Sequence, residues 1–394
     1  QQGDKVIALS LDVDSDAVAS ILSEKAAQLN QEAVDNGLVR ENGAFKIIKG
    51  EQGIEVNVED SIAAIENYIS SEWDGGNAEI ELVAEVVEPR GSEEDLEQIT
   101  DMMGSYTTNY KDSGQNRCDN ISNATSKING TLLYPGEEFS VYEAIGPLDA
   151  ANGYELAGAY ENGQTVESYG GGVCQVSTTL YNAVILAELE ITQRSNHSMI
   201  VSYVKPSMDA AIAGDYKDLR FVNNQDIPIY IEGYTEGKNV TFKIYGHDTR
   251  PSNRVVTYES EVVSEQDPGT QYVATGDPAG YMKTAQGKHI GYVARLWKVV
   301  TVDGVEESRE IFNKSTYKAS PKIVNVGTAS ADPNVSAVIG AALATGDEAT
   351  INAAVAPYAA SAAAILNPAP VEQPSQEEQA ITGTVDESQI TGGE

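Results

Sequence analysis

Along the first 90 residues, hydrophobic and polar positions alternate between a strand pattern and a helix pattern. The segment KVIALSLDVD follows the two-residue period of a strand, whereas residues 14–36 carry apolar side chains at helical spacing. Two short strands in FKIIKG and GIEVNV, a helix over residues 62–69 and a closing strand in AEIELVAEVVEP are expected to follow. These elements predict a small α/β domain over residues 1–92.

A polar link that contains glycine and proline leads into a second predicted domain, residues 98–250. Its centre is a helix that begins at Val173, where apolar residues recur at spacings of three and four on one face. Strands are expected after that helix, in SMIVSYV, LRFVNN, IPIYIEGY and VTFKIYG. A helix followed by antiparallel strands is typical of an α+β domain.

The remainder of the chain changes pattern twice. Residues 251–327 carry strand patterns without helix patterns, which predicts a small all-β module. Residues 328–394 are rich in Ala, Pro, Gln and Glu and contain no Lys or Arg. This composition predicts a disordered acidic tail. Its alanine-rich stretch, residues 335–366, could form weak helix, but a spacer is the first choice. The fold class expected for the whole chain is therefore multidomain α+β.

The charge of the chain narrows the classes of partner. With 60 acidic and 25 basic residues the formal net charge is −35. Such a surface repels nucleic acid and anionic lipid, so neither is expected as a partner. The sequence has no run of the roughly 20 apolar residues that a membrane helix needs, so membrane attachment is expected only through an anchor outside this chain. The acidic, cysteine-poor composition fits an exported bacterial protein.

The candidate chemistry centres on one of the two cysteines, Cys174 in the segment YGGGVCQ. Three glycines are unfavourable inside a helix, so they are expected to form a loop that leads into the helix at Val173. Cys174 would then lie in the first helical turn, where the helix dipole and free N–H groups lower the pKa of a thiol. The same N–H groups can hold an oxyanion beside the sulfur. This combination predicts a nucleophilic cysteine.

A nucleophilic cysteine needs a base, and the chain contains three histidines. His197 follows Cys174 by 23 residues and is the first choice, because a helix that ends and turns back would bring it to the helix start. His247 and His289 are the weaker candidates.

The histidine in turn needs a group that orients it. Asp209 is the first choice and Asp218 the second, because both lie just beyond His197. Sequence order does not decide between the two carboxylates.

Cys174 also has interpretations without catalysis. A cysteine near a helix start is often a small buried hydrophobic residue. A disulfide between Cys118 and Cys174 is a second alternative, because exported proteins permit it. No metal site is expected, since two cysteines and three scattered histidines lack zinc-ligand spacing.

Four blocks of sequence together resemble the VanW domain over about residues 105–248. They are NGTLLYPGEEFSVYEAIGP, YGGGVCQVSTTLYNAVILAELEI, NHSMIVSYVKP and KDLRFVNNQDIPIYI, and they occur in the family's order. The unit before them resembles the peptidoglycan-binding domain that often precedes VanW domains. Residues 252–327 are weakly similar to the G5 module that often follows them.

The resemblance implies an L,D-transpeptidase of peptidoglycan, in which Cys174 is the nucleophile and His197 its partner. The thiolate would attack a tetrapeptide stem, D-Ala would leave, and a second stem would resolve the thioester into a three-to-three cross-link. No cofactor is needed. Further positions are expected to donate to the oxyanion, flank the site or meet a substrate carboxylate. They are Gly171, Gly172, Val173, Gln175, Ser177, Tyr169 and Arg220.

Two other functions stay open at this stage. The chain could be a wall-binding protein without catalysis, which would be indifferent to Cys174→Ala. It could also be a cysteine carboxypeptidase or endopeptidase, which would cleave a stem rather than join two. Under each interpretation the expected location is the cell wall of a Gram-positive bacterium, and the expected state is a monomer.

Overall fold

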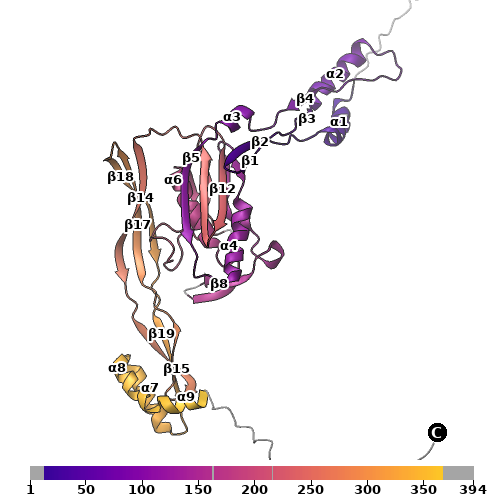
Figure 1. Ribbon diagram of the computed structural model, residues 1–394. Coiled ribbons are helices and arrows are strands. Elements are labelled where there is room, and N and C mark those ends of the chain that lie inside the picture. The colour runs from indigo at the N-terminus through magenta and orange to yellow at the C-terminus, as the bar shows by residue number, and fades with distance from the viewer. Residues whose placement is uncertain (1–12, 162–163, 215, 367–394) are drawn as a thin grey trace, which may run out of the picture. The chain divides into compact units, whose positions relative to one another are not determined.

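The computed structural model describes residues 13–161, 164–214 and 216–366 (Figure 1). Most of the predicted strand KVIALSLDVD lies outside the described residues. The chain divides into two compact units, and each is treated separately below. Unit 1 contains Gln1–Asp267 and His289–Ser320, and unit 2 contains Pro268–Lys288 and Pro321–Glu394.

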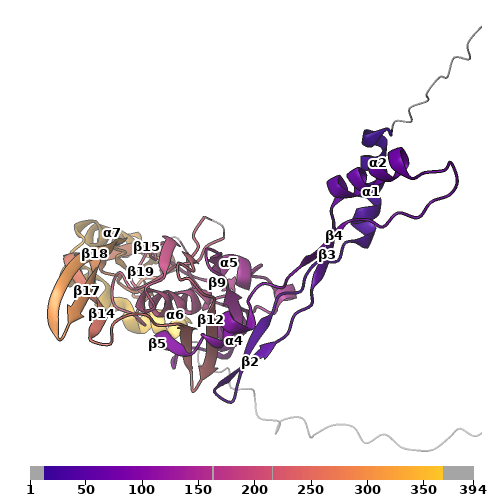
Figure 2. The same ribbon diagram turned by 90° about the horizontal axis from the view of Figure 1, so that it is seen from above.

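The N-terminal part of unit 1 combines two helices with two antiparallel strand pairs, in agreement with the predicted mixture of helix and strand. In chain order its elements are α1 (Ser15–Leu29), β1 (Gly37–Glu41), β2 (Ala44–Ile48), β3 (Gly53–Val56), α2 (Val58–Ser71) and β4 (Ala84–Val87). The side chains of Asp14 and Asn57 cap the two helices by accepting backbone N–H groups of their first turns. The helices pack against each other, and α1 packs against β3 (Figure 2).

The central part of unit 1 is built on a four-stranded antiparallel sheet and two helices. They are β5 (Asp101–Asn109), α4 (Gln115–Ile128), β6 (Thr131–Leu133), α6 (Val173–Leu186), β12 (Ile229–Glu236) and β13 (Asn239–Gly246). The strand order is β5-β13-β12-β6, and both helices pack on the sheet and on each other (Figure 1). The apolar stripe of α6, including Val176, Leu180 and Val184, lies in the largest core.

The approach between β5 and α6 is close enough to require glycine. A Cβ atom built on Gly104 would lie 2.2 Å from the carbonyl oxygen of Ala183. This contact fixes α6, and therefore its first turn, against the sheet.

Smaller elements surround this centre. They are α3 (Glu93–Glu97), β7 (Glu138–Ser140), α5 (Val141–Ile145), η1 (Ala150–Asn152), β8 (Leu156–Glu161), β9 (Gln164–Tyr169), β10 (Glu190–Gln193) and β11 (Arg220–Val222). Strands β8 and β9 form a hairpin that leads directly into α6, and a three-stranded sheet has the order β10-β11-β7.

The predicted all-β module forms two sheets that belong to different units. In unit 1, β14 (Arg254–Gln266), β17 (Gly291–Val302) and β18 (Val305–Tyr317) pair antiparallel in the order β14-β17-β18. In unit 2, β15 (Thr270–Pro278), β16 (Met282–Gln286) and β19 (Lys322–Ala329) have the order β15-β19-β16. The mixed α+β class with several antiparallel sheets is confirmed.

The alanine-rich stretch differs from the predicted spacer because it folds into helices. These are α7 (Pro333–Thr345), α8 (Glu348–Val355), η2 (Ala356–Tyr358) and α9 (Ala359–Leu366). Their apolar residues, such as Ile339, Ile351 and Val355, pack with Val324 and Val326 of β19. The alanine-rich composition was interpreted as disordered because it has few large apolar side chains, yet these few are spaced to meet a sheet. The predicted disorder of residues 367–394 lies outside the described residues.

One stretch in unit 2 has the length and apolar character of a membrane span, which corrects the expectation that the sequence contains none. It is the helical run Glu348–Leu366, with a mean hydropathy of 1.4. Length and composition alone carry this assignment, and core helices of soluble proteins meet the same criterion. In this structure Ile351 and Val355 of the run are buried in the core of unit 2.

Candidate active site

A groove of about 1610 Å³ in unit 1 contains both Cys174 and His197. Five segments that are distant in sequence contribute most of its lining. They are residues 109–117, 156–159, 166–175, 197–203 and 211–217, apart from residues 200 and 215. Residues Lys318, Ala319 and Ser320, which follow β18, also line the groove.

The three glycines before Cys174 form the turn through which β9 enters α6. A Cβ atom on Gly171 would lie 2.6 Å from the carbonyl oxygen of Ala157, so any side chain there would collide with β8. Gly172 precedes the helix with φ of +116°, a conformation that favours glycine. The buried side chain of Asn120 on α4 donates to the Gly171 carbonyl at 3.1 Å. The turn therefore places Cys174 as the second residue of α6.

Two of the backbone N–H groups at this turn are already in use. Val173 donates to the Gly170 carbonyl at 3.0 Å, and Gln175 donates to the Gly172 carbonyl at 2.9 Å. Within the part of the chain that the structure describes, the N–H groups of Gly172 and Cys174 have no hydrogen-bond acceptor. These two groups are the available donors beside the sulfur.

Cys174 is partly exposed and reduced, and the side chain of His197 interacts with its sulfur closely enough for each group to shift the pKa of the other. The backbone N–H of Ile212 donates to the sulfur at 3.4 Å. Burial raises the pKa of the thiol, but the hydrogen bond and positive charge of His197 outweigh burial and hold this pKa below its ordinary value. Burial lowers the pKa of His197, whereas Asp209 and Cys174 raise it to about 9. The arrangement favours the thiolate over the thiol and the imidazolium over the neutral imidazole.

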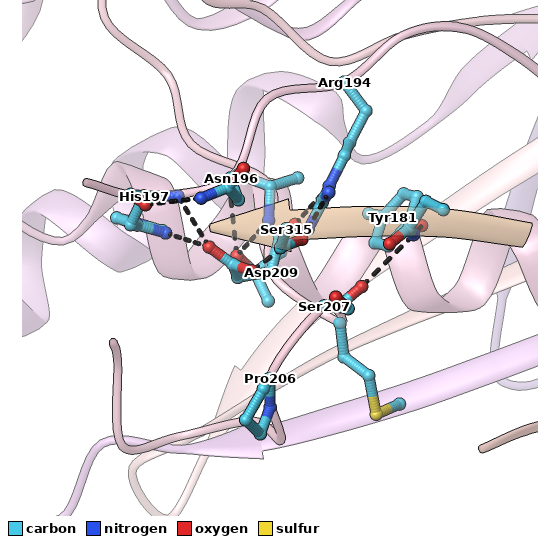
Figure 3. Close-up of polar contacts among 12 residues, drawn as sticks. Tyr181, Arg194, Asn196, His197, Pro206, Ser207, Asp209 and Ser315 are labelled. Carbon is cyan, nitrogen blue, oxygen red and sulfur yellow. Dashed lines mark hydrogen bonds and ion pairs between the residues drawn. The ribbon is translucent and has the colours of Figure 1, made fainter. Parts of the chain in front are cut away.

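Asp209 holds His197 at two points (Figure 3). Its Oδ2 atom lies 2.7 Å from Nδ1 of the imidazole and accepts the backbone N–H of His197, also at 2.7 Å. Its Oδ1 atom accepts from Arg194 at 3.0 Å and from the hydroxyl of Tyr317. Burial raises the pKa of Asp209, but His197 and Arg194 outweigh it and keep the carboxylate ionised. Since Asp209 engages Nδ1, Nε2 is the ring nitrogen left to face sulfur.

Cys174 and His197 thus line one groove, and Asp209 contacts His197 as an orienting carboxylate would. Comparisons with known proteins agree with the sequence blocks that surround these residues. Residues 116–245 match the family model described as "VanW like protein". The chain is 30% identical over 237 residues to the uncharacterized protein YoaR of Bacillus subtilis, covering 60% of this chain and 76% of YoaR.

The chain belongs to the family of VanW-like proteins. The vancomycin B-type resistance protein VanW of Enterococcus faecalis is also 30% identical, over 118 residues, which is 28% of this chain and 42% of that protein. Residues 1–74 match the model described as "Putative peptidoglycan binding domain", and residues 257–329 match the G5 domain. The predicted family and domain order are confirmed. The solved IgA1 protease G5 domain is 26% identical over 20% of this chain and 94% of its own, with a TM-score of 0.15.

The VanW-like domain places the second-choice carboxylate, Asp218, in a different cluster. Asp218 is fully buried and accepts from the Ser140 hydroxyl at 2.6 Å and from the Tyr142 backbone N–H at 2.9 Å. Arg220 forms ion pairs with Asp218, Glu138 and Glu143. Neither Asp218 nor Arg220 lines the groove, so the structure offers no contact by which they would orient His197 or meet a substrate there.

The other predicted flanking positions of the VanW-like domain divide between the groove and the core. Tyr169 lies on the groove wall and is 42% exposed. The Gln175 side chain donates to the Thr108 hydroxyl and accepts from Arg117, so it braces the groove wall. Ser177 is fully buried and does not line the groove, which is incompatible with a flanking role there.

The disulfide alternative is wrong in this structure, because Cys118 and Cys174 are both free. Cys118 packs at the edge of the main core, and its thiol points at the Ser113 carbonyl at 3.7 Å. The two alternative histidines also lie elsewhere. His247 lies 3.9 Å from Asp101, and His289 pairs with Ser320 through its backbone.

Three residues at the site escaped the sequence analysis of this VanW-like protein. Arg194 lies three residues before His197, and this closeness in sequence was the only feature that could have indicated it as a site residue. Tyr203 lies in the groove with its ring 6.5 Å from the His197 ring in an edge-on arrangement. No sequence pattern pointed to Tyr317, because it falls in the segment that was predicted to be a separate β module. Among the described residues, no three His, Cys, Asp or Glu side chains gather in the manner of a metal site.

Proposed function

We propose that this protein is a cell-wall enzyme that transfers acyl groups between peptidoglycan stems through Cys174, as an L,D-transpeptidase. The observation that carries the proposal is a reduced, partly exposed cysteine in the same groove as His197, whose imidazole a buried Asp209 holds in place. The match of residues 1–74 to a peptidoglycan-binding model and the G5 match support a location at the wall. We extend this to a monomeric protein at the surface of a Gram-positive cell.

The first half-reaction forms a thioester. The Cys174 thiolate attacks the carbonyl carbon that precedes the terminal D-Ala of a tetrapeptide stem, and a carbon–sulfur bond forms. The backbone N–H groups of Gly172 and Cys174 are available to stabilise the oxyanion. His197 then gives its proton to the departing amine, the carbon–nitrogen bond breaks and D-Ala leaves.

The second half-reaction resolves the thioester. The side-chain amine of a diamino acid on a second stem attacks the same carbonyl carbon, and His197 accepts the proton that the amine loses. The carbon–sulfur bond breaks and the thiolate is restored, which leaves a three-to-three cross-link. If water replaces the amine, the same acyl-enzyme gives a carboxypeptidase.

The charges in the groove suit an anionic stem. Basic side chains outnumber acidic ones in its lining, which contains Lys111, Arg117, Lys217 and Lys318 against Asp112 and Glu167, although the whole chain carries a formal net charge of −35. Carboxylates of a stem peptide would therefore meet local cations rather than the surrounding acidic surface. Arg220, proposed from the sequence for this role, pairs with acidic residues outside the groove, so we transfer the role to these lysines.

The experiment that tests this function incubates the full chain with purified disaccharide-tetrapeptide under reducing conditions and analyses the products by mass spectrometry. Two variants accompany it, Cys174→Ala and the matched control Cys118→Ala. We expect a dimer that lacks one D-Ala in the wild type and in Cys118→Ala, and no product with Cys174→Ala.

Other outcomes select between the alternatives. Release of D-Ala without dimer, dependent on Cys174, would support the carboxypeptidase. Cleavage within the stem would support an endopeptidase. Unchanged substrate with equal binding by wild type and Cys174→Ala would contradict the enzyme and leave a wall-binding protein.

A further inference from the structure

Tyr317, the last residue of β18, is 2% exposed and contacts the loop that carries Asp209. Its hydroxyl donates to Oδ1 of Asp209 and accepts the backbone N–H of Ser207 at 2.7 Å. Asp209 uses its other oxygen, Oδ2, for His197. A donor on one carboxylate oxygen fixes the rotation of the group, and so fixes the oxygen that meets the imidazole.

The loop before Asp209 is held by the same sheet at further points. Ser260 of β14 donates to the carbonyl of Pro206 at 2.6 Å, and Asn313 of β18 donates to the carbonyl of Ser207 at 3.2 Å. Ser207 is fully buried and has φ of +66°, a conformation that is strained for a residue other than glycine. Such a conformation persists only where neighbouring groups enforce it.

The segment that carries His197 is anchored to β18 and the residue after it as well. Asn196 donates from its side chain to the carbonyl of Thr316 at 2.9 Å, and the backbone N–H of Lys318 donates to the carbonyl of Ser198 at 2.7 Å. These contacts lie on both sides of His197 in the sequence. The imidazole and its carboxylate are therefore both held by one element.

The phenol of Tyr317 is suited to a permanent donor role. Burial and the adjacent negative charge of Asp209 raise its pKa above the ordinary value, so it stays protonated across the neutral range. Arg194 completes the arrangement, because it binds Oδ1 of Asp209 and donates to the hydroxyl of Ser315 on β18 at 2.9 Å.

We propose that Tyr317 is a positioning residue for the His197–Asp209 pair, which makes the sheet β14-β17-β18 part of the catalytic unit. The segment that matches the VanW model, residues 116–245, lacks this group. The role in catalysis rests on the proposed function, whereas the effect on Cys174 reactivity does not. The sheet is then required for an intact site in addition to any contact it makes with the wall.

The test measures how fast iodoacetamide alkylates Cys174 as a function of pH, in full-length protein that carries Cys118→Ala. With Tyr317→Phe we expect about 10-fold slower alkylation at pH 6, because a loosened Asp209 holds the imidazolium less well beside the thiolate. The acid limb of the profile should shift to higher pH. An unchanged profile would overturn the proposal.

Tyr258→Phe is the matched control. Tyr258 on β14 donates to the carbonyl of Ile185 on α6 at 2.8 Å, so its loss removes a comparable hydrogen bond without touching the site. We expect its alkylation profile to match that of the parent. Equal slowing in both variants would mean that the sheet acts only through stability, and would contradict a positioning role.

A double-mutant cycle separates positioning from a general effect. In an Asp209→Asn background, Tyr317→Phe should slow alkylation by less than about 2-fold, because the carboxylate that it positions is already lost. Full additivity of the two changes would overturn the proposal.

If Tyr317→Phe does not fold, 3-fluorotyrosine at position 317 replaces it, because this residue keeps the shape and the donor. A stronger donor draws charge from Asp209 and so weakens its hold on the imidazolium, and the acid limb of the alkylation profile should shift to higher pH. No shift would again contradict the proposal.

The outcomes also separate this inference from the proposed function. Slower alkylation in Tyr317→Phe, in a protein that makes no cross-link, would sustain the positioning role and contradict transpeptidation. Cross-linking that is as fast in Tyr317→Phe as in the wild type would do the reverse.

Discussion

Two buried aspartates, Asp209 and Asp218, have different hydrogen-bond partners although their local features are alike. Both are fully buried, they lie nine residues apart in the sequence, and both pair with an arginine. Asp209 accepts from His197, whereas Asp218 accepts from the Ser140 hydroxyl and the Tyr142 backbone at the start of α5. Burial and an arginine partner are therefore common to both carboxylates. What distinguishes Asp209 from Asp218 is the set of partners other than arginine.

The largest expected contrast between the two is in activity. Asp209→Asn should slow acyl transfer by about 10³-fold, because the amide cannot stabilise the imidazolium or fix its tautomer. Asp218→Asn should leave the rate of the folded fraction within about 2-fold. Steady-state rates, normalised to the titratable Cys174 thiol, check both expectations. Equal losses of rate in the two variants would show that Asp209 and Asp218 do not differ in role.

For the free energy of unfolding we expect the opposite contrast, with the larger effect from substitution of Asp218. Asp218→Ala leaves the Ser140 hydroxyl and the Tyr142 N–H without their buried acceptor, so unfolding should become easier by about 2–3 kcal/mol. Urea denaturation followed by circular dichroism measures this change, and Thr192→Ala, which alters an exposed contact with Glu138, is the control. A shift in midpoint no larger than that of the control would show that the Asp218 cluster is not structural.

The dependence of the acyl-transfer rate on pH gives a further test of the role of Asp209. Because the pKa of His197 is raised to about 9, the imidazolium and its stabilising pairing are fully present below about pH 6.5 and are lost as pH rises through about 9. Acyl transfer should therefore decline above about pH 9, since His197 then lacks the proton for the leaving amine. It should also decline at low pH, where the thiolate is protonated.

In Asp209→Asn the alkaline limb should move towards the ordinary histidine value of about 6.5. The measurement is a profile of rate against pH for the wild type and the variant at constant ionic strength. An alkaline limb that stays in place in the variant would show that Asp209 does not set the pKa of His197.

The smallest expected effect concerns the two arginines. Arg220→Met removes contacts with two exposed glutamates and with the buried Asp218, all outside the groove, so the rate and KM of the folded fraction should stay within about 2-fold. Arg194→Met should reduce the rate by about 10-fold or more, because its guanidinium is buried against Asp209. A raised KM in Arg220→Met alone would restore the substrate role that the sequence suggested for it.

Local sequence patterns predicted much of the fold. The helix of Val173–Leu186 was visible as a stripe of apolar residues after three glycines, because helical periodicity and glycine strain are properties of a few consecutive residues. The alanine-rich helices of unit 2 were missed for the converse reason. Their propensity is high, but their burial depends on the β19 strand that they cover.

The sequence alone placed the Cys174 thiol in the first turn of a helix, because the glycine turn and the helix are adjacent in sequence. It also narrowed the base and the carboxylate to a few candidates. The choice of Asp209 over Asp218 required the packed structure, since the distance from each carboxylate to His197 depends on how residues 198–209 fold back. Tyr317 lies 108 residues beyond Asp209, and no periodicity in a sequence specifies a contact across that separation. Long-range contacts are made by packing, and here packing completes the candidate site.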